Sequence, residues 1–322
     1  MKAFKYLPLV FGITLLLSCN HKESGVPVVG FVDAFEDATV GQARTGFTDA
    51  LKKNGFSDDQ HTVKIEYHNA EGDQPTLGLI VNQFISDKVD LLATCTTLST
   101  VTAIQKTTTI PVFAMVSPTP ARMNVVSSTG ANPPNLFGVV EDLNYIDTSF
   151  NIITTLLKPT AGKLVIGMIY NQAEPQSADA VNRLKELATK SNVTLEVLPL
   201  NNSADAQLVT QSLLSKHINA FFALPDNSVF ASFETILKNC NQANVPIFTS
   251  EAGLVKRGAV AAFGADMYLW GYQAGEQAAQ FLKTKKVDGL KPEMVKVRKR
   301  VYNAAAAQKY HIAIPSNFEA VK

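Results

Sequence analysis

Histidine, cysteine and tryptophan are scarce in this sequence of 322 residues, which contains five, three and one of them, respectively. No two histidines have the spacing of an HExxH zinc site and no two cysteines form a CxxC pair, so no motif for a metal or a thioredoxin-type redox site is present. A GxSxG nucleophile elbow, a P-loop and a GxGxxG turn after the first expected strand are also missing. We therefore expect no catalytic residue, no cofactor and no metal ion.

The sequence has no excess of charge of either sign. Its 29 basic and 28 acidic residues give a formal net charge of +1, and they form no long basic stripe or RNP-like motif. Because nucleic-acid-binding proteins depend on such features, we expect no nucleic-acid partner. With 46% hydrophobic and 18% charged residues, the composition is that of an ordinary globular protein. The length suffices for two domains of roughly 120–150 residues each.

An apolar run at 6–17 follows the basic N-terminus and is too short for a normal transmembrane helix. It ends in Leu-Leu-Ser-Cys, which resembles a bacterial lipobox. We expect residues 1–18 to be a lipoprotein signal peptide, Cys19 to carry the lipid, and 19–27 to be a flexible tether. The protein would then lie in the cell envelope, held at a membrane and facing the periplasm or the exterior. An ordinary secretory signal with a chance cysteine is the alternative.

From residue 28 onward, short apolar segments alternate with segments in which apolar residues recur at helical spacing. The expected strands are 28–32, 63–67, 89–93, 110–114, 136–140, 163–170, 193–199, 220–224, 245–249 and 259–263. The expected helices are 40–53, 73–85, a segment ending at 106, 146–157, 177–191, 204–215, 227–239 and 268–283. A charged strand and an alanine-rich helix follow between 293 and 314. Such alternation is typical of an α/β protein with parallel sheets.

A repeated sequence pattern indicates two lobes of similar construction: Ile-Pro-Val-Phe at 110–113 is similar to Val-Pro-Ile-Phe at 245–248. We expect two α/β lobes, each a parallel sheet flanked by helices, joined by a hinge. The first lobe is expected to comprise 28–137 plus 264–291, and the second 138–263 plus 292–322. Ligands of such folds bind at the carboxyl ends of the strands, so the polar residues at those ends are the candidate site.

In the first lobe, the candidates follow three strands. Thr96 and Thr97 come after the strand at 89–93, where hydroxyl side chains are good helix N-caps and free N–H groups bind a carboxylate or phosphate. Ser117 follows the next strand in a Ser-Pro turn. Phe35 follows the first strand, in a position to cover an apolar part of a ligand. Plain helix caps and turns are the alternatives.

In the second lobe, two polar residues follow the strand at 163–170. Asn171 comes directly after that strand, and Ser177 is expected to be the N-cap of the next helix. If Ser177 has this position, the N–H groups of the helix are available to an anion.

Three carboxylates recur at the ends of successive second-lobe elements. Asp226 stands beside Asn227 after the strand at 220–224, Glu251 follows the next strand, and Asp266 follows the last. Each alone is also explained as a helix cap or a solvated turn. Together they favour a site that holds a cationic group of a ligand.

Several segments give the chain a family resemblance that extends from about residue 26 to the C-terminus. They are Val29–Val32, Ala43–Phe47, Tyr67–Gln74, Ser86–Leu91, Ile169–Asn171, Pro225–Asn227 and Val255–Ala259. In these the chain resembles the ABC-transporter substrate-binding family that includes tryptophan- and tyrosine-binding proteins. The resemblance implies a type I periplasmic binding protein, with two Rossmann-like lobes joined by three crossovers. It also implies an amino-acid-like ligand, with an aromatic amino acid favoured, and an ABC permease and ATPase as partners.

For a zwitterionic ligand, the resemblance and the strand ends together suggest a division of roles. Thr96, Thr97 and their N–H groups would hold the carboxylate. Asp226, helped by Asp266 or Glu251, would hold the ammonium.

Phe35 would stack on the apolar part of that ligand. A binding protein that reports to a membrane signalling receptor is an alternative function, as is an importer component for another small metabolite. A hydrolase that uses Cys95 as its nucleophile is a third, although no histidine lies at an expected strand end to serve as its base.

Overall fold

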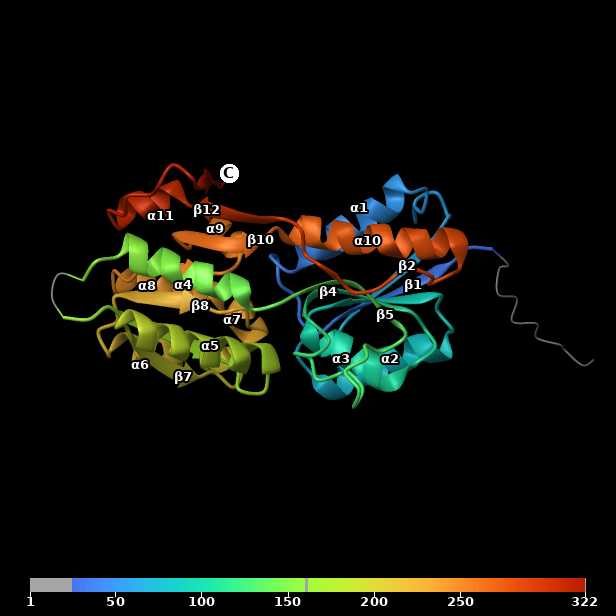
Figure 1. The fold of residues 1–322 in the computed structure, drawn as a ribbon, viewed down its shortest axis with the longest axis horizontal. Coiled ribbons are helices and arrows are strands. Elements are labelled where there is room, and N and C mark those ends of the chain that lie inside the picture. Colours follow the sequence, from blue (N-terminus) through green and yellow to red (C-terminus); the bar gives the residue numbers. More distant parts are fainter. Residues whose placement is uncertain (1–24, 160–161, 322) are drawn as a thin grey trace, which may run out of the picture.

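Two α/β lobes lie side by side in the computed structural model, which describes residues 25–159 and 162–321 (Figure 1). The first sheet has the strand order β11-β5-β4-β3-β1-β2, and the second has the order β13-β12-β10-β9-β8-β6-β7. Neighbouring strands are parallel except for the antiparallel pair β10–β12. The expected fold class is confirmed. The expected signal peptide at 1–18 and Cys19 lie outside the described residues.

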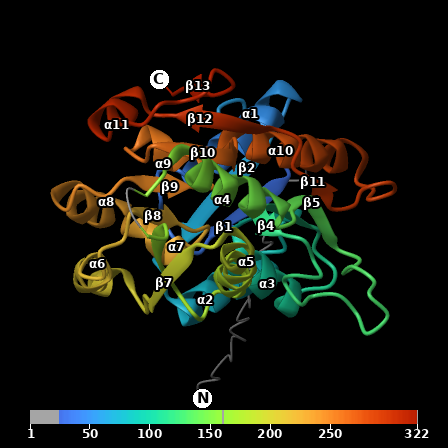
Figure 2. The same cartoon turned by 60° about the vertical axis from the view of Figure 1, so that its left-hand side comes forward.

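The first lobe is built from both ends of the chain. Its strands are β1 (Val28–Asp33), β2 (Lys64–Asn69), β3 (Leu91–Cys95), β4 (Val112–Pro118), β5 (Leu136–Glu141) and β11 (Glu293–Met294). Its helices are α1 (Gly41–Lys53), α2 (Gln74–Ser86), α3 (Thr97–Lys106) and α10 (Met267–Thr284). Figure 2 shows α1 and α10 on one side of this sheet and α2 and α3 on the other.

The second lobe contains the middle of the chain and its C-terminal segment. Its strands are β6 (Val165–Tyr170), β7 (Thr194–Pro199), β8 (Ala220–Ala223), β9 (Ile247–Thr249), β10 (Ala261–Ala265), β12 (Arg298–Tyr302) and β13 (Glu319–Ala320). Its helices are α4 (Asn144–Leu156), α5 (Pro175–Ser191), α6 (Ala206–Leu214) after a 3₁₀ turn (Ser203–Asp205), α7 (Asn227–Ala231), α8 (Phe233–Gln242), α9 (Ala252–Lys256) and α11 (Ala304–Lys309).

Two differences between the expected helices and the structure bear on the site. The helix expected at 177–191 begins at Pro175, whose fixed φ suits the first helical position, so Glu174 rather than Ser177 occupies the N-cap position. The helix expected at 227–239 is two short helices that meet at Ser232. By contrast, Asp73 caps α2 as its position predicts, because its carboxylate accepts the Thr76 N–H at 2.8 Å.

Three crossovers join the lobes: residues 142–143, the residue Asp266 between β10 and α10, and residues 295–297. Two of them are bonded to each other, since the Asp266 N–H donates to the Val297 carbonyl at 3.4 Å. The boundaries expected at 137 and 291 differ from these crossovers. Strand β5 stays in the first sheet through Glu141, and β11 pairs with it before the chain leaves.

Helix α10 reaches the cleft because it packs very tightly on α1. A Cβ added to Gly271 would overlap the main-chain carbonyl of Ala43, and one added to Gly46 would overlap the carbonyl of Tyr268. The two backbones can therefore approach only because these positions lack side chains. This contact fixes the first turn of α10 at the edge of the interlobe space.

Candidate functional site: the cleft between the lobes

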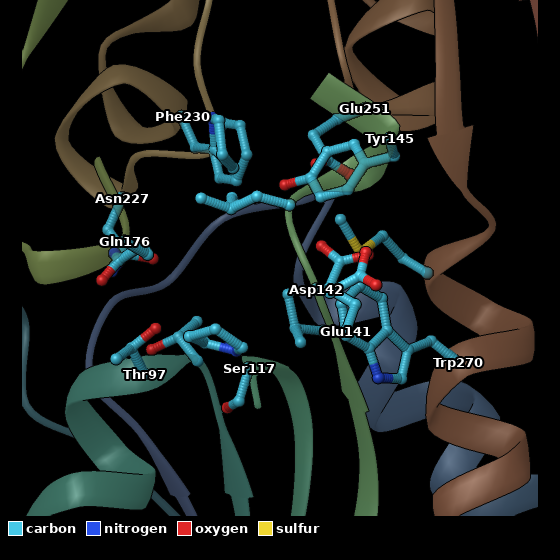
Figure 3. Close-up of a pocket in the computed structure, with 16 residues that line it drawn as sticks. Thr97, Ser117, Glu141, Asp142, Tyr145, Gln176, Asn227, Phe230, Glu251 and Trp270 are labelled. Atoms are coloured by element: carbon cyan, nitrogen blue, oxygen red, sulfur yellow. The ribbon is translucent and has the colours of Figure 1, made fainter. Parts of the chain in front are cut away.

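A pocket lies between the lobes at the carboxyl ends of both sets of strands (Figure 3). The empty space within it is about 490 Å³, a figure that includes space open to solvent. Its walls come from the ends of β3 and β4, from the crossover after β5, from the first turn of α10, and from the second-lobe loops after β6, β8 and β9. The site is thus incomplete in either lobe alone.

The first-lobe wall is the N-terminus of α3. Thr96 is its N-cap residue, but the Thr96 side chain makes no capping hydrogen bond, and its buried hydroxyl has no partner among the described residues. Thr97 and Ser117 line the pocket beside it. The hydroxyl of Ser117 is held by that of Thr100 at 3.0 Å. Uncapped N–H groups at the positive end of a helix, with hydroxyls beside them, form a suitable seat for a carboxylate.

Two residues of this wall have strained backbones. Thr96 has φ 74° and ψ 165°, and Val116, after a shift in the β4–β5 register, has φ 52°. Both are β-branched, and such residues rarely have a positive φ. A conformation of this kind costs about 1–3 kcal/mol and is concentrated at functional sites. The two outliers therefore support a binding role for this wall.

The opposite wall carries Glu251, whose side chain is placed across the pocket from Thr97 and Ser117 (Figure 3). The residue is 2% exposed. One of its oxygens accepts the Ser250 hydroxyl at 3.2 Å, and the other has no partner among the described residues. Burial raises the pKa of Glu251 to about 8. A buried carboxyl group with an open oxygen and no protein cation is suited to an ammonium group of a ligand.

The neighbouring acidic groups differ from Glu251 because they already have partners. Glu141 forms an ion pair with Arg298, whose guanidinium lies 4.0 Å from the ring centre of Tyr145. Asp142 accepts the main-chain N–H of Asn144 at 2.9 Å. Among the acidic side chains that line the pocket, Glu251 is therefore the one that has a buried oxygen without a hydrogen-bond partner and no ion pair among the described residues.

Aromatic side chains form the remaining walls. Tyr145, Phe230 and Trp270 line the pocket together with Met267 and Leu143. The Trp270 indole N–H donates to the Val139 carbonyl at 2.8 Å, which fixes the ring. Because aromatic rings stack and bury large areas, these walls suit a ligand with a planar apolar body.

Glu174 holds two further pocket residues in place. Its buried carboxylate accepts both the N–H and the side-chain amide of Asn227, at 3.1 and 3.0 Å, and also the amide of Gln176. Burial, together with the charge of Asp226, raises its pKa to about 8. Glu174 thus acts on the pocket through Asn227 and Gln176.

The structure brings together five of the residues proposed from the sequence: Thr96, Thr97, Ser117, Asn227 and Glu251 all line the pocket. These came from the ends of different strands, as the rule for parallel sheets predicts.

Five other candidates do not line the pocket, and two of them are acidic. Asp226 is 0% exposed, and its carboxylate accepts the N–H groups of Asn171 and Val229 at 2.7 and 3.0 Å, so it caps α7. Asp266 likewise caps α10 by accepting the Leu269 N–H at 3.1 Å. Capping, the alternative stated for these carboxylates, is what the structure shows them doing.

The other three make local contacts outside the pocket. The Asn171 amide donates to the Ser228 hydroxyl at 3.0 Å, and the buried Ser177 hydroxyl donates to a main-chain carbonyl at 3.5 Å. The Phe35 ring is half-buried and lies against Gly72.

Sequence reasoning missed Tyr145, Gln176 and Phe230. All three lie in or beside the first turns of helices, and each of these helices was expected with different bounds. A correct N-cap at 174 would have placed Gln176 at the pocket. No spacing in the sequence distinguishes Tyr145 or Phe230 from core aromatic residues.

Residues 25–159 and 162–321 contain neither a candidate membrane-spanning helix nor a candidate metal site. None of the helices described there is long and apolar enough to cross a membrane. No group of three or more histidine, cysteine or acidic residues in these ranges is arranged to hold a metal ion.

Two α/β lobes joined by three crossovers, with a polar and aromatic pocket between them, define a two-lobed ligand-binding protein. Residues 27–321 match the family described as ABC transporter substrate binding protein, and the chain belongs to that family. The expected family relationship is therefore confirmed. Members of this family bind solutes and are not enzymes.

Individual relatives agree with this assignment. The chain is 30% identical over 291 residues to the tyrosine-binding protein of Clostridioides difficile strain R20291, covering 86% of this chain and 83% of that protein. It is similar to an ABC domain from Streptococcus pneumonia in complex with L-Trp, with a TM-score of 0.81, 25% identity, and coverage of 90% and 96%. It is also similar to a ligand-free, open substrate-binding protein with adhesive properties from Clostridium difficile, with a TM-score of 0.66, 28% identity, and coverage of 92% and 99%.

Proposed function

We propose that this protein binds a zwitterionic aromatic amino acid in the interlobe cleft and delivers it to an ABC importer. The proposal rests on one observation. The buried Glu251 carboxyl group has an oxygen without a hydrogen-bond partner, and it lies across the pocket from the N-terminus of α3, which has no side-chain cap. The ligand carboxylate lies at Thr97 and the first N–H groups of α3. Its ammonium lies at Glu251, and its ring lies between Tyr145 and Phe230. Relatives that are described with tyrosine or L-Trp support this ligand class.

Ligand binding and lobe closure are coupled in this proposal. The carboxylate seat is in the first lobe and Glu251 is in the second, so one ligand bridges both and favours the closed arrangement. The TM-score is higher with the L-Trp complex, 0.81, than with the ligand-free open protein, 0.66, although the sequence identities are similar. This difference supports a lobe arrangement nearer to that of the liganded relative.

The lipid anchor is part of the same proposal and rests on the lipobox-like sequence that ends at Cys19. A lipid on this residue holds the protein in the cell envelope, beside the permease that receives the ligand. Mass spectrometry of the N-terminal peptide checks this: a diacylated cysteine is expected. An unmodified N-terminus elsewhere would support the ordinary secretory signal.

The ligand proposal is tested by calorimetric titration with tryptophan, tyrosine and phenylalanine and with two analogues. Tryptamine lacks the carboxylate and indole-3-propionate lacks the ammonium, and each is expected to bind at least about tenfold more weakly than tryptophan. Mass spectrometry of protein purified without denaturation identifies any ligand that it retains. If no aromatic amino acid binds, or if both analogues bind as tightly as tryptophan, the proposal is wrong.

A pair of variants tests the assignment of the ammonium site. Glu251→Gln is expected to weaken tryptophan binding by about tenfold or more, because the ammonium loses its charged partner. Asp266→Asn is the matched control, since that carboxylate caps α10 outside the pocket. We expect it to lower the melting temperature and to change the affinity less than about threefold. Equal losses in the two variants would contradict the role of Glu251.

A further inference from the structure

The loop between β1 and α1, none of whose residues lines the pocket, contacts the second lobe. Its Asp37 carboxylate accepts the Arg257 guanidinium at 2.7 Å, and the Thr39 hydroxyl accepts the same nitrogen at 3.0 Å. Arg257 directly follows α9 in the second lobe. The pair is well covered, with side chains that are 17% and 5% exposed for Arg257 and Asp37.

The surface of α9 is shaped to receive this loop. A Cβ added to Gly253 would overlap the side chain of Thr39, which is 1% exposed. The absence of a side chain at 253 therefore lets the first-lobe loop lie directly on the helix. The contact is a packed interface with an ion pair in it, rather than two long side chains that meet in solvent.

Arg257 also holds a wall of the pocket. Its second terminal nitrogen donates to the main-chain carbonyl of Phe230 at 3.1 Å, and Phe230 lines the cleft. The same guanidinium therefore links the first-lobe loop, through one residue, to the position of an aromatic wall.

Both members of the pair keep partners when the lobes separate. Arg257 has a bidentate pair with Glu234 of its own lobe, at 2.9 and 2.8 Å. Asp37 accepts the N–H groups of Thr39 and Val40 in its own loop, at 2.8 and 3.1 Å. Neither charge is left without a partner by opening, so the contact can break and re-form at modest cost.

We propose that Arg257 is a positioning residue for ligand binding: by bonding Asp37 across the lobes and the Phe230 carbonyl within its own, it fastens the closed cleft and slows ligand release. The inference rests on the proposed function for the identity of the ligand. The contact between Arg257 and Asp37 is a property of the two lobes, and its effect on lobe closure is measurable without ligand.

The decisive comparison uses three charge-neutralising variants. Asp37→Asn removes the interlobe partner of Arg257, and Glu234→Gln removes its partner within the lobe. Asp179→Asn removes the partner of Arg122, a second interlobe pair at 3.2 Å whose side chains are 39% and 40% exposed. Exposed pairs of this kind contribute little, so this variant is the control for loss of an interlobe charge.

Stopped-flow measurement with tryptophan is expected to show about tenfold faster dissociation for Asp37→Asn, with association changed less than about threefold. Glu234→Gln and Asp179→Asn are expected to dissociate within about threefold of the wild type. The Asp37→Asn effect is expected to persist at 0.5 M salt because the pair is shielded from solvent. Equal dissociation rates in all three variants would overturn the proposal.

Small-angle scattering without ligand separates this inference from the proposed function. Asp37→Asn is expected to have a larger radius of gyration than Glu234→Gln, because its closed state is less populated. If no amino acid binds but this difference is present, the ligand proposal is wrong, and the proposal that the Arg257–Asp37 contact stabilises the closed arrangement is supported. Identical scattering curves would overturn the fastening, whatever the ligand.

Discussion

At the scale of the residue, the charge of Glu251 is expected to depend on what occupies the cleft. Burial raises its pKa from the ordinary value of 4.5 to about 8. Between pH 4.5 and pH 8, the folded protein therefore keeps a proton on Glu251 that the unfolded chain has already released. The contribution of this residue to folding stability is full below pH 4.5 and is lost as the pH rises through 8.

This pKa shift predicts that the folding stability depends on pH, and that Glu251→Gln removes this dependence. Between pH 5 and pH 8.5, we expect the unfolding free energy of the unliganded wild type to fall by about 1–3 kcal/mol relative to the variant. Urea denaturation of both proteins at each pH measures it. Burial also raises the pKa values of Asp33 to about 7 and of Glu174 to about 8, but both residues are common to the two proteins. A constant difference across this range would contradict the prediction.

Ligand binding is expected to release the same proton. An ammonium group beside Glu251 favours the ionised carboxylate, so affinity should rise with pH up to about 8, by at most about tenfold per pH unit. Calorimetry with tryptophan at pH 6.5, in two buffers of different ionisation enthalpy, reports the protons released. We expect close to one for the wild type and close to zero for Glu251→Gln. Buffer-independent heats for the wild type would show that Glu251 does not ionise on binding.

At the scale of the element, α10 positions Met267 and Trp270 in the pocket through its contact with α1. Gly271→Ala places a Cβ against the main-chain carbonyl of Ala43, which has no room to move without shifting the helix. We expect a loss of about 2–4 kcal/mol of stability, measured by urea denaturation, and weaker ligand binding.

Gly78→Ala in α2 is the matched control for this substitution. Its added Cβ meets only the flexible end of Lys106, at 3.3 Å. Alanine in a helix interior is favoured over glycine by up to about 1 kcal/mol, so this variant is expected to be as stable as the wild type or more stable. Similar losses in the two variants would show that the α1–α10 contact is not the cause.

The elements also show how far the sequence determines the site. Apolar periodicity predicted the alternation of strands and helices, because each buried face needs its own spacing. It did not predict the break at Ser232, since the apolar spacing continues through both helices. Strand-end reasoning found both Glu251 and Asp226, yet a carboxylate that caps a helix and one that faces a ligand occupy the same place in the sequence. Only the positions of the neighbouring N–H groups distinguish the two roles.

At the scale of the whole molecule, the lobes are joined where two crossovers meet a buried charge pair. Glu141 ends the last strand before the first crossover, and Arg298 begins the first strand after the third. The two form an ion pair, and burial lowers the pKa of Arg298 to about 10, so it stays charged at neutral pH. This pair holds the first and third crossovers together beside the pocket.

Removing one member of this pair is expected to cost more than removing both. Glu141→Gln leaves the Arg298 guanidinium buried without its carboxylate, so we expect a loss of about 3–5 kcal/mol in urea denaturation. Adding Arg298→Met is expected to recover part of that loss, because the buried charge is then gone. Glu293→Gln, which removes an exposed pair with Lys296 near the same crossover, serves as the control and should cost about 1 kcal/mol or less. The prediction is contradicted if the double variant is less stable than Glu141→Gln by the full cost of a second, independent substitution. The two residues would then not act as a pair, and other contacts would hold the crossovers together.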